Sequence, residues 1–304
     1  MRVLRWGRSA YETQQQLDDE SRRLGALGLH VSAYVGQQPP VEGVDILVLT
    51  SKVRVDGAVL ARARALKLVV TTTSGHEHID VVACRRQGVT VARCPLARRD
   101  AVVDTSLAMA LTLLRDLPFL HARSREGIWA RGELPARPLK LVVGLPVGIV
   151  GHGVIGARAA SIWRALGARV LVSDPRMKGS RGLAELIEEC SVISLHCDLN
   201  PTTQNLLSRE ILSAMRPEMV LINTARGRLV DVDALLECEL RVGLDVFPEE
   251  PWPRLAELAA RPNVLLTPHA AGYHEGLGQA LAAELATTVE AFLNDRPVPH
   301  PVGG

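Results

Sequence analysis

The sequence predicts an α/β protein of two domains, each built on a parallel β-sheet, with a cleft between the domains. Three observations lead to this. The chain has 304 residues, 47% of them hydrophobic, which is enough for two domains of about 150 residues each. Short apolar runs alternate with helix-period stretches along most of the chain. The later apolar runs are almost continuous, as expected for strands covered on both faces.

The first alternating segment covers about the first ninety residues. Gly88 is well suited to the position just after a helix, where a positive φ is favoured, so a strand should begin directly after it. We expect strands at 31–34, 46–50, 68–73 and 89–92, and helices at 56–65 and 79–87.

A long helix is predicted from Asp100 to Arg115, where nearly every face of the pattern is apolar. Such a helix is expected to be buried within one subunit or between subunits, and it also makes a plausible crossover between domains. A second alternating segment begins near Leu141. Its expected elements are a strand at 147–150, a helix at 157–166, a strand at 169–173, a helix at 182–190, and strands at 192–196 and 220–223; the final helix is expected over 277–294.

We therefore predict two Rossmann-like or flavodoxin-like domains. Residues 1–95 together with 276–304 form one domain, and residues 96–275 form the other.

Composition bounds the class of ligand. Thirty-five Lys and Arg residues nearly balance 33 Asp and Glu residues, so no strong field attracts nucleic acid or an anionic membrane. The first residues lack an apolar signal segment, and no apolar run approaches the roughly 18 residues that span a bilayer. The five cysteines form no CxxC pair, which favours reduced thiols. We expect a soluble, cytoplasmic protein that binds a small metabolite, neither nucleic acid nor a membrane.

The strongest single motif is a glycine-rich turn, Gly151-His152-Gly153-Val154-Ile155-Gly156, between a predicted buried strand and an Ala-rich helix. In a dinucleotide-binding turn of this form, the first glycine permits the tight turn and the second lets the pyrophosphate approach the backbone. The third allows the helix to pack closely on the strand. The motif predicts a dinucleotide site made by all six residues, and residues 96–275 are then the NAD-binding Rossmann domain. The bland alternative is a structural glycine turn.

Asp174 ends the next predicted strand, close to the spacing of about 20 residues expected for the acid that binds the adenosine ribose. A carboxylate accepts hydrogen bonds from both ribose hydroxyls and repels the 2′-phosphate of NADP. The predicted cofactor is therefore NAD(H), although Arg176 is close enough in the chain to weaken the discrimination.

Three later segments complete a pattern. They are Asn223-Thr224-Ala225-Arg226-Gly227 with Leu229-Val230-Asp231, then Leu244 to Pro251, and then Leu266-Thr267-Pro268-His269. With the glycine motif and the segment from Ser74-Gly75 to Ile79-Asp80, the chain resembles the D-isomer-specific 2-hydroxyacid dehydrogenases, including phosphoglycerate dehydrogenases and glyoxylate/hydroxypyruvate reductases, over nearly its whole length.

The resemblance implies roles for matching residues. Arg226 binds the substrate carboxylate and carbonyl, His269 is the acid/base, Glu250 is the partner of His269, and Asp245 contacts the nicotinamide carboxamide. The chemistry agrees, because reduction of a ketone needs a proton near neutral pH, which an imidazolium supplies. A carboxylate on the far ring nitrogen stabilises that imidazolium, and a guanidinium fork matches a carboxylate beside a carbonyl. Cofactor contacts are also expected from Cys197, Thr224 and Gly272.

The substrate is expected to meet the first domain, together with Arg226 from the second. In the family, the loop matching Ser74 and Gly75 presents backbone N–H groups to the substrate carboxylate, and Thr50 lies where specificity is set. His76, Glu77, His78 and Asp80 suggest a metal, but they lack the spacing of a known metal motif, and hydride transfer needs none. No metal is predicted.

Two departures from the family pattern stand out. Only residues 237–243 separate Leu236 from Leu244, a shorter segment than the family usually has, which affects the approach to Asp245. Phosphoglycerate dehydrogenases usually carry an arginine where this chain has Thr50, so a phosphorylated substrate is disfavoured unless Lys52 or Arg54 substitutes.

The sequence thus predicts an NAD-dependent 2-hydroxyacid dehydrogenase that interconverts a small 2-keto acid and its D-2-hydroxy acid, with residues 1–95 and 276–304 as the substrate domain. Glyoxylate or hydroxypyruvate is the expected substrate. The resemblance also implies a homodimer, with 100–115 as a candidate interface. The alternative is an NAD(H)-sensing binding protein, because the family includes corepressors that keep the cofactor site.

Overall fold

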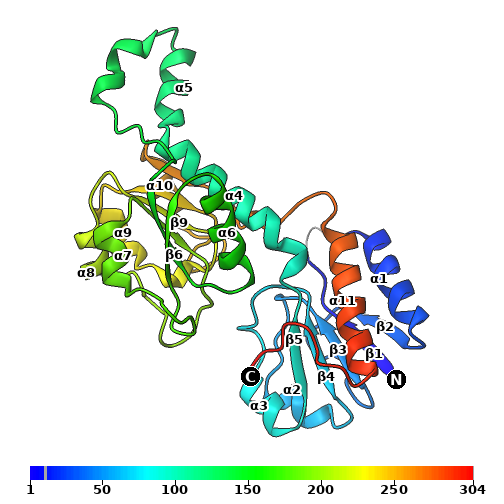
Figure 1. Cartoon of the computed structure of the whole chain (residues 1–304). Helices are drawn as coiled ribbons and strands as arrows, with labels where there is room; N and C mark the ends of the chain where they lie inside the picture. The colour runs from blue at the N-terminus through cyan, green and yellow to red at the C-terminus, as the bar shows by residue number, and fades with distance from the viewer. Residues whose placement is uncertain (10–11, 304) are drawn as a thin grey trace. The chain divides into compact units, whose positions relative to one another are not determined.

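The computed structural model of the chain describes residues 1–9 and 12–303 and divides into two compact units (Figure 1). Unit 1 consists of Met1–Arg98 and His274–Gly304, and unit 2 consists of Arg99–Tyr273. The chain therefore passes between the units twice.

Unit 1 is built on a five-stranded sheet in which all strands are parallel. The strand order is β2-β1-β3-β4-β5, so the carboxyl ends of β1, β3 and β4 lie next to one another. The strands are β1 (Arg2–Trp6), β2 (His30–Tyr34), β3 (Ile46–Leu49), β4 (Leu68–Thr71) and β5 (Thr90–Arg93). The sequence predicted the last four of these, and Gly88 before β5 has the expected positive φ of 74°.

Helices cover both faces of this sheet because alternate strand residues point to opposite sides. In β3, Ile46 and Val48 pack with α1 (Gln14–Ala26) and α11 (Leu277–Leu293), which lie side by side in Figure 1. Leu47 and Leu49 pack toward α2 (Gly57–Arg62) and α3 (Val81–Arg86). Side chains cap the helices that begin at these loops: Thr13 caps α1, Asp56 caps α2 and Asp80 caps α3.

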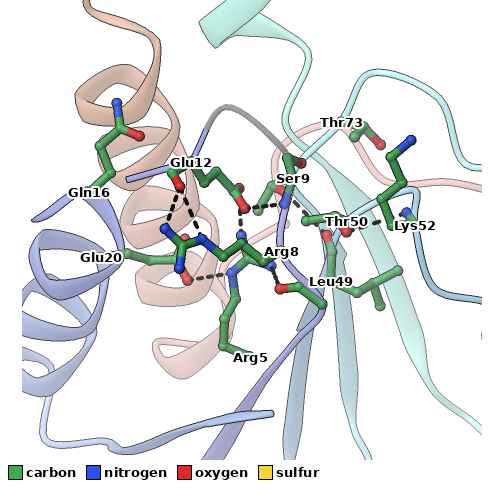
Figure 2. A network of polar contacts seen from close by, with 12 residues as sticks. Arg5, Arg8, Ser9, Glu12, Gln16, Glu20, Leu49, Thr50, Lys52 and Thr73 are labelled. Atoms are coloured by element: carbon green, nitrogen blue, oxygen red, sulfur yellow. Dashed lines mark hydrogen bonds and ion pairs between the residues drawn. The ribbon is translucent and has the colours of Figure 1, made fainter. Parts of the chain in front are cut away.

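A buried ion network holds the chain directly after β1. The Arg5 guanidinium donates to Glu20 Oε1 at 2.9 Å and to Glu12 Oε1 at 2.7 Å, as Figure 2 shows. All three side chains are at most 8% exposed. Because two buried carboxylates need charged donors, this arrangement fixes the start of α1 against the end of β1.

Unit 2 contains a six-stranded parallel sheet with the order β11-β10-β9-β8-β6-β7. Its strands are β6 (Pro146–Val150), β7 (Arg169–Ser173), β8 (Val192–Leu195), β9 (Val220–Asn223), β10 (Arg241–Leu244) and β11 (Val264–Leu266). The chain leaves β6 toward β7 on one side and returns to β8 on the other. This reversal of strand order is the place where open α/β sheets bind ligands, outside the carboxyl ends of the strands.

Two layers of helices enclose the second sheet. On one face, α4 (Leu96–Leu114) and α6 (Val154–Ala165) bury Met109, Leu113 and Trp163 against β6. On the other face lie α7 (Leu183–Glu189), α8 (Arg209–Ala214), α9 (Val232–Glu237) and α10 (Leu255–Ala259).

The shortened segment before Asp245 is accommodated by a short α9. The helix ends at Glu237, and β10 begins at Arg241 in register with β9 and β11. The Arg241 guanidinium, which is buried, donates to Asp116 Oδ1 at 2.6 Å. The strand that leads to Asp245 therefore keeps its place in the sheet despite the shorter connection.

None of the helices in the described ranges is long and apolar enough to cross a membrane.

Candidate active site

The glycine-rich turn lies at the carboxyl end of β6, next to the reversal in strand order. Gly151 has a φ of 90°, and a Cβ there would lie 2.7 Å from the backbone N of Cys197. A Cβ on Gly156 would lie 1.9 Å from Gly151 O, whereas a Cβ on Gly153 would meet nothing within 4 Å. Two glycines therefore permit close packing, and the third leaves open backbone at the start of α6, as a pyrophosphate needs.

Asp174 follows β7 and faces this turn. Its Oδ2 accepts the His152 backbone N–H at 2.7 Å, and its Oδ1 accepts that of Arg176 at 2.9 Å. Burial acts to raise the pKa of Asp174, but these N–H groups and the Arg176 charge hold the pKa below its ordinary value. The carboxylate is therefore charged, as an acid that binds ribose hydroxyls and repels a phosphate should be.

His196 lies beneath the glycine turn and was not predicted from the sequence. A Cβ added to Gly156 would lie 3.2 Å from the Cβ of His196. Burial lowers the pKa of His196 to about 4. Its Nε2 is 2.9 Å from Ser194 Oγ. The ring is neutral and supports the turn, and no sequence signal distinguished it from an ordinary strand end.

The Arg226 loop follows β9 and is held by Asn223. The Asn223 side chain donates to Arg226 O at 2.8 Å and accepts the Ala225 N–H at 3.0 Å. Gly227 fits here because a Cβ would lie 2.0 Å from the carbonyl carbon of Phe247. Thr224 Oγ1 is buried and has no hydrogen-bond partner among the described residues. An orphaned hydroxyl at the carboxyl end of this sheet fits a site that a bound cofactor completes.

Asp245 follows β10 and organises the turn that carries His269. Its Oδ1 accepts hydrogen bonds from the Thr267 hydroxyl at 2.6 Å and from the Ala270 N–H at 2.7 Å. Its Oδ2 accepts one from the Ala271 N–H at 3.0 Å. The side chain is only 1% exposed. Burial raises the pKa of Asp245, and the three hydrogen bonds offset part of that rise. Gly272 directly follows this turn.

His269 and Glu250 form a close pair. His269 Nδ1 lies 2.6 Å from Glu250 Oε2, while Glu250 Oε1 accepts the Phe247 N–H at 3.1 Å. His269 has a φ of 54°, and its N–H donates to Asp245 O at 2.8 Å. Burial acts to raise the pKa of Glu250, but the hydrogen bond and charge of His269 hold it below its ordinary value. A charged carboxylate on Nδ1 leaves Nε2 as the ring atom for proton transfer.

In unit 1, the predicted substrate residues lie at the carboxyl ends of β3 and β4. Ser74 Oγ is buried and makes no hydrogen bond within the described part of the chain. Thr50 is fully buried and accepts the Lys52 N–H at 3.3 Å (Figure 2). Thr50 thus lies beneath the surface of the loop, whereas Lys52 is exposed on it.

The histidine cluster after Gly75 is tied into the loop. His78 Nε2 lies 3.1 Å from Thr71 Oγ1. Over residues 1–9 and 12–303, no three metal-ligating side chains come together.

Comparison with known proteins identifies the family of this chain. Residues 107–271 match the model of the D-isomer specific 2-hydroxyacid dehydrogenase, NAD binding domain. A glyoxylate reductase of Thermococcus gammatolerans is 30% identical over 277 residues, which cover 85% of this chain and 83% of that protein. The chain therefore belongs to the D-isomer-specific 2-hydroxyacid dehydrogenase family, as the sequence indicated.

Solved structures agree with this assignment. A Thermus thermophilus protein is 35% identical with a TM-score of 0.80, and each chain is covered completely. A D-lactate dehydrogenase of Aquifex aeolicus, solved with NAD and lactic acid, is 26% identical over 96% of each chain with a TM-score of 0.80. The chain is thus an NAD-dependent 2-hydroxyacid dehydrogenase, and NAD(H) is its cofactor.

Proposed function

We propose that the protein interconverts a small 2-keto acid and its D-2-hydroxy acid by hydride transfer. The 2.6 Å pair of His269 and Glu250, set on the turn that Asp245 holds, is the observation that carries the proposal. Gly151, Gly153, Gly156 and Asp174 would hold the dinucleotide. Further contacts would come from Cys197, Thr224, Asp245 and Gly272. When bound, NADH supplies the hydride in reduction, and NAD⁺ accepts it in oxidation.

The chain's own residues handle the proton and the substrate. Protonated His269 donates from Nε2 to the carbonyl oxygen as the carbonyl carbon is reduced, and neutral His269 takes that proton back in oxidation. Glu250 keeps its negative charge and steadies the ring in both directions. Arg226 binds the substrate carboxylate and polarises the carbonyl. Ser74 and Gly75 would bind the same carboxylate through the backbone, with Thr50 shaping the loop beside them.

The direct test is NADH oxidation with glyoxylate, hydroxypyruvate, pyruvate, phenylpyruvate and 3-phosphohydroxypyruvate. Turnover of at least one small 2-keto acid, giving the D-hydroxy acid by chiral chromatography, is the expected result. The thermococcal relative named a glyoxylate reductase favours glyoxylate within the panel. Tight NADH binding without turnover of any of the five would overturn the proposal in favour of an NAD(H)-sensing protein.

We further propose that the protein forms a homodimer in the cytoplasm. No residue of α5 (Leu117–Arg125) or of the 3₁₀ helix η1 (Ala130–Ala136) is buried, and Trp129 between them is 87% exposed. The 100–115 segment instead packs largely into the core of unit 2, so the segment 117–136 is the better interface for a second copy. Light scattering should give twice the chain mass, and Trp129→Glu should reduce the measured mass to that of one chain.

The unpaired state of all five cysteines supports a reducing compartment, as proposed for the cytoplasm.

A further inference from the structure

We infer that Arg93 and Arg98 are positioning residues that hold the Thr72–Gly75 turn so that its backbone N–H groups bind the substrate carboxylate. This inference rests on the proposed function. Both arginines lie behind the turn in unit 1: Arg93 ends β5, and Arg98 lies in the first turn of α4.

Every carbonyl of the segment 71–75 is turned toward a protein donor. Arg98 Nη1 donates to Thr72 O at 2.5 Å, and Arg93 Nη1 donates to Ser74 O at 2.9 Å. The Cys94 N–H reaches Thr71 O at 3.1 Å and Thr73 O at 3.3 Å, and Thr73 Oγ1 donates to Gly75 O at 2.8 Å.

The N–H groups of the same turn are in the opposite condition. Within the described part of the chain, the N–H groups of Thr73, Ser74 and Gly75 have no acceptor, and Ser74 Oγ beside them has no partner. Three successive N–H donors with a hydroxyl form the type of backbone concavity that binds anions.

Peptide geometry connects the two observations. In a trans peptide, the carbonyl of one residue and the N–H of the next point in opposite directions. The bond from Arg98 to Thr72 O therefore turns the Thr73 N–H outward, and the bond from Arg93 to Ser74 O does the same for the Gly75 N–H. The Arg98 side chain, in a residue only 8% exposed, adds positive charge behind the turn, where low dielectric makes it effective.

This arrangement assigns the two arginines a function in substrate affinity rather than in proton or hydride transfer. Neither needs to touch the substrate. Each fixes a peptide plane, and together they favour a carboxylate over a neutral group at the turn.

The test compares Arg93→Gln and Arg98→Gln with Arg93→Lys and Arg98→Lys. We expect each glutamine variant to raise both the KM for the 2-keto acid and the Ki of oxalate about tenfold. kcat should stay within about threefold, and the Kd of NADH should not change. The lysine variants keep the charge and one donor, so they should recover most of the affinity. Arg62→Gln is the matched control, because Arg62 also donates to a backbone carbonyl in unit 1, that of Pro39 at 2.9 Å.

Unchanged KM and Ki in both glutamine variants, or an equal rise in Arg62→Gln, would overturn the inference. If a glutamine variant does not fold, the lysine variant and the other position still decide it. A wild type without turnover would count against the proposed function alone, because calorimetry of oxalate binding to wild type and variants with NADH present still measures the turn.

Discussion

The turn that carries His269 and the turn that carries Ser74 each follow a strand of a parallel sheet, but groups of opposite charge hold them from behind. Asp245 takes up the N–H groups of Ala270 and Ala271, and a side chain, His269, is left for chemistry. Arg98 and Arg93 take up carbonyls, and backbone N–H groups are left for a ligand. The charge buried behind a turn thus determines which of its groups remain available.

The largest effect should come from removing the side chain that the acidic turn presents. His269→Ala removes the proposed proton donor but leaves the backbone bonds to Asp245, so kcat should fall by about 10²-fold or more. NADH oxidation with the best 2-keto acid measures this, and NADH fluorescence should show an unchanged Kd. A kcat within about threefold of wild type would mean that the proton comes from another group.

Removing the charge behind the same turn should have the next largest effect. Asp245→Asn replaces one acceptor with an amide donor that faces an N–H or hydroxyl donor. We expect kcat to fall about tenfold and the free energy of unfolding to fall by about 1–3 kcal/mol.

Thr267→Val is the control for this change, because it removes one donor to Asp245 and leaves the carboxylate in place. Its losses should be smaller. Equal losses in the two variants would show that the hydroxyl, rather than the charge, holds the turn.

The two turns also differ in how much the sequence revealed. The sequence predicted roles for His269, Glu250 and Arg226 because each belongs to a motif with its own chemistry. In the structure, His269 and Glu250 do form a pair. Most strands of the two sheets were also predicted, since buried parallel strands are continuous apolar runs. β1 was not predicted: Arg2 and Arg5 interrupt its apolar pattern. The ion network that lets Arg5 be buried needs Glu12 and Glu20, which lie beyond the strand, 7 and 15 residues further along the chain.

The arginines behind the Ser74 turn could not be found from sequence for a related reason. Arg93 and Arg98 lie in different elements, and their shared target is a set of backbone carbonyls, which carry no residue identity. The same holds for His196, which lies beneath the glycine turn but follows a different strand, β8. Motifs predict candidate reactive groups, whereas supporting groups depend on which segments the fold brings together.

Asp174 is a second acid that collects backbone N–H groups, and it sharpens the comparison at the cofactor. Asp174→Ser removes the charge that we propose repels a 2′-phosphate, so the ratio of kcat/KM for NADPH to that for NADH should rise about tenfold. Arg176→Ala should lower this ratio, because the positive charge of Arg176 beside the carboxylate would attract a 2′-phosphate. The Arg176 side chain is 80% exposed. An unchanged ratio in Asp174→Ser would show that this carboxylate does not select the cofactor.

The smallest effect concerns Glu250, whose folded pKa lies below its ordinary value of 4.5. A carboxyl with a lowered pKa stabilises the fold fully above its unfolded pKa, and that contribution is lost as the pH falls through the folded pKa. Since the pair is partly exposed, wild type should exceed Glu250→Gln in Tm by only about 1 °C near pH 6. Scanning calorimetry should show this difference shrinking toward zero as the pH falls below Glu250's folded pKa. A Tm difference that grew on acidification would contradict this prediction. It would mean that burial outweighs the hydrogen bonds from His269 and Phe247, so that the pKa of Glu250, like that of Asp245, is raised.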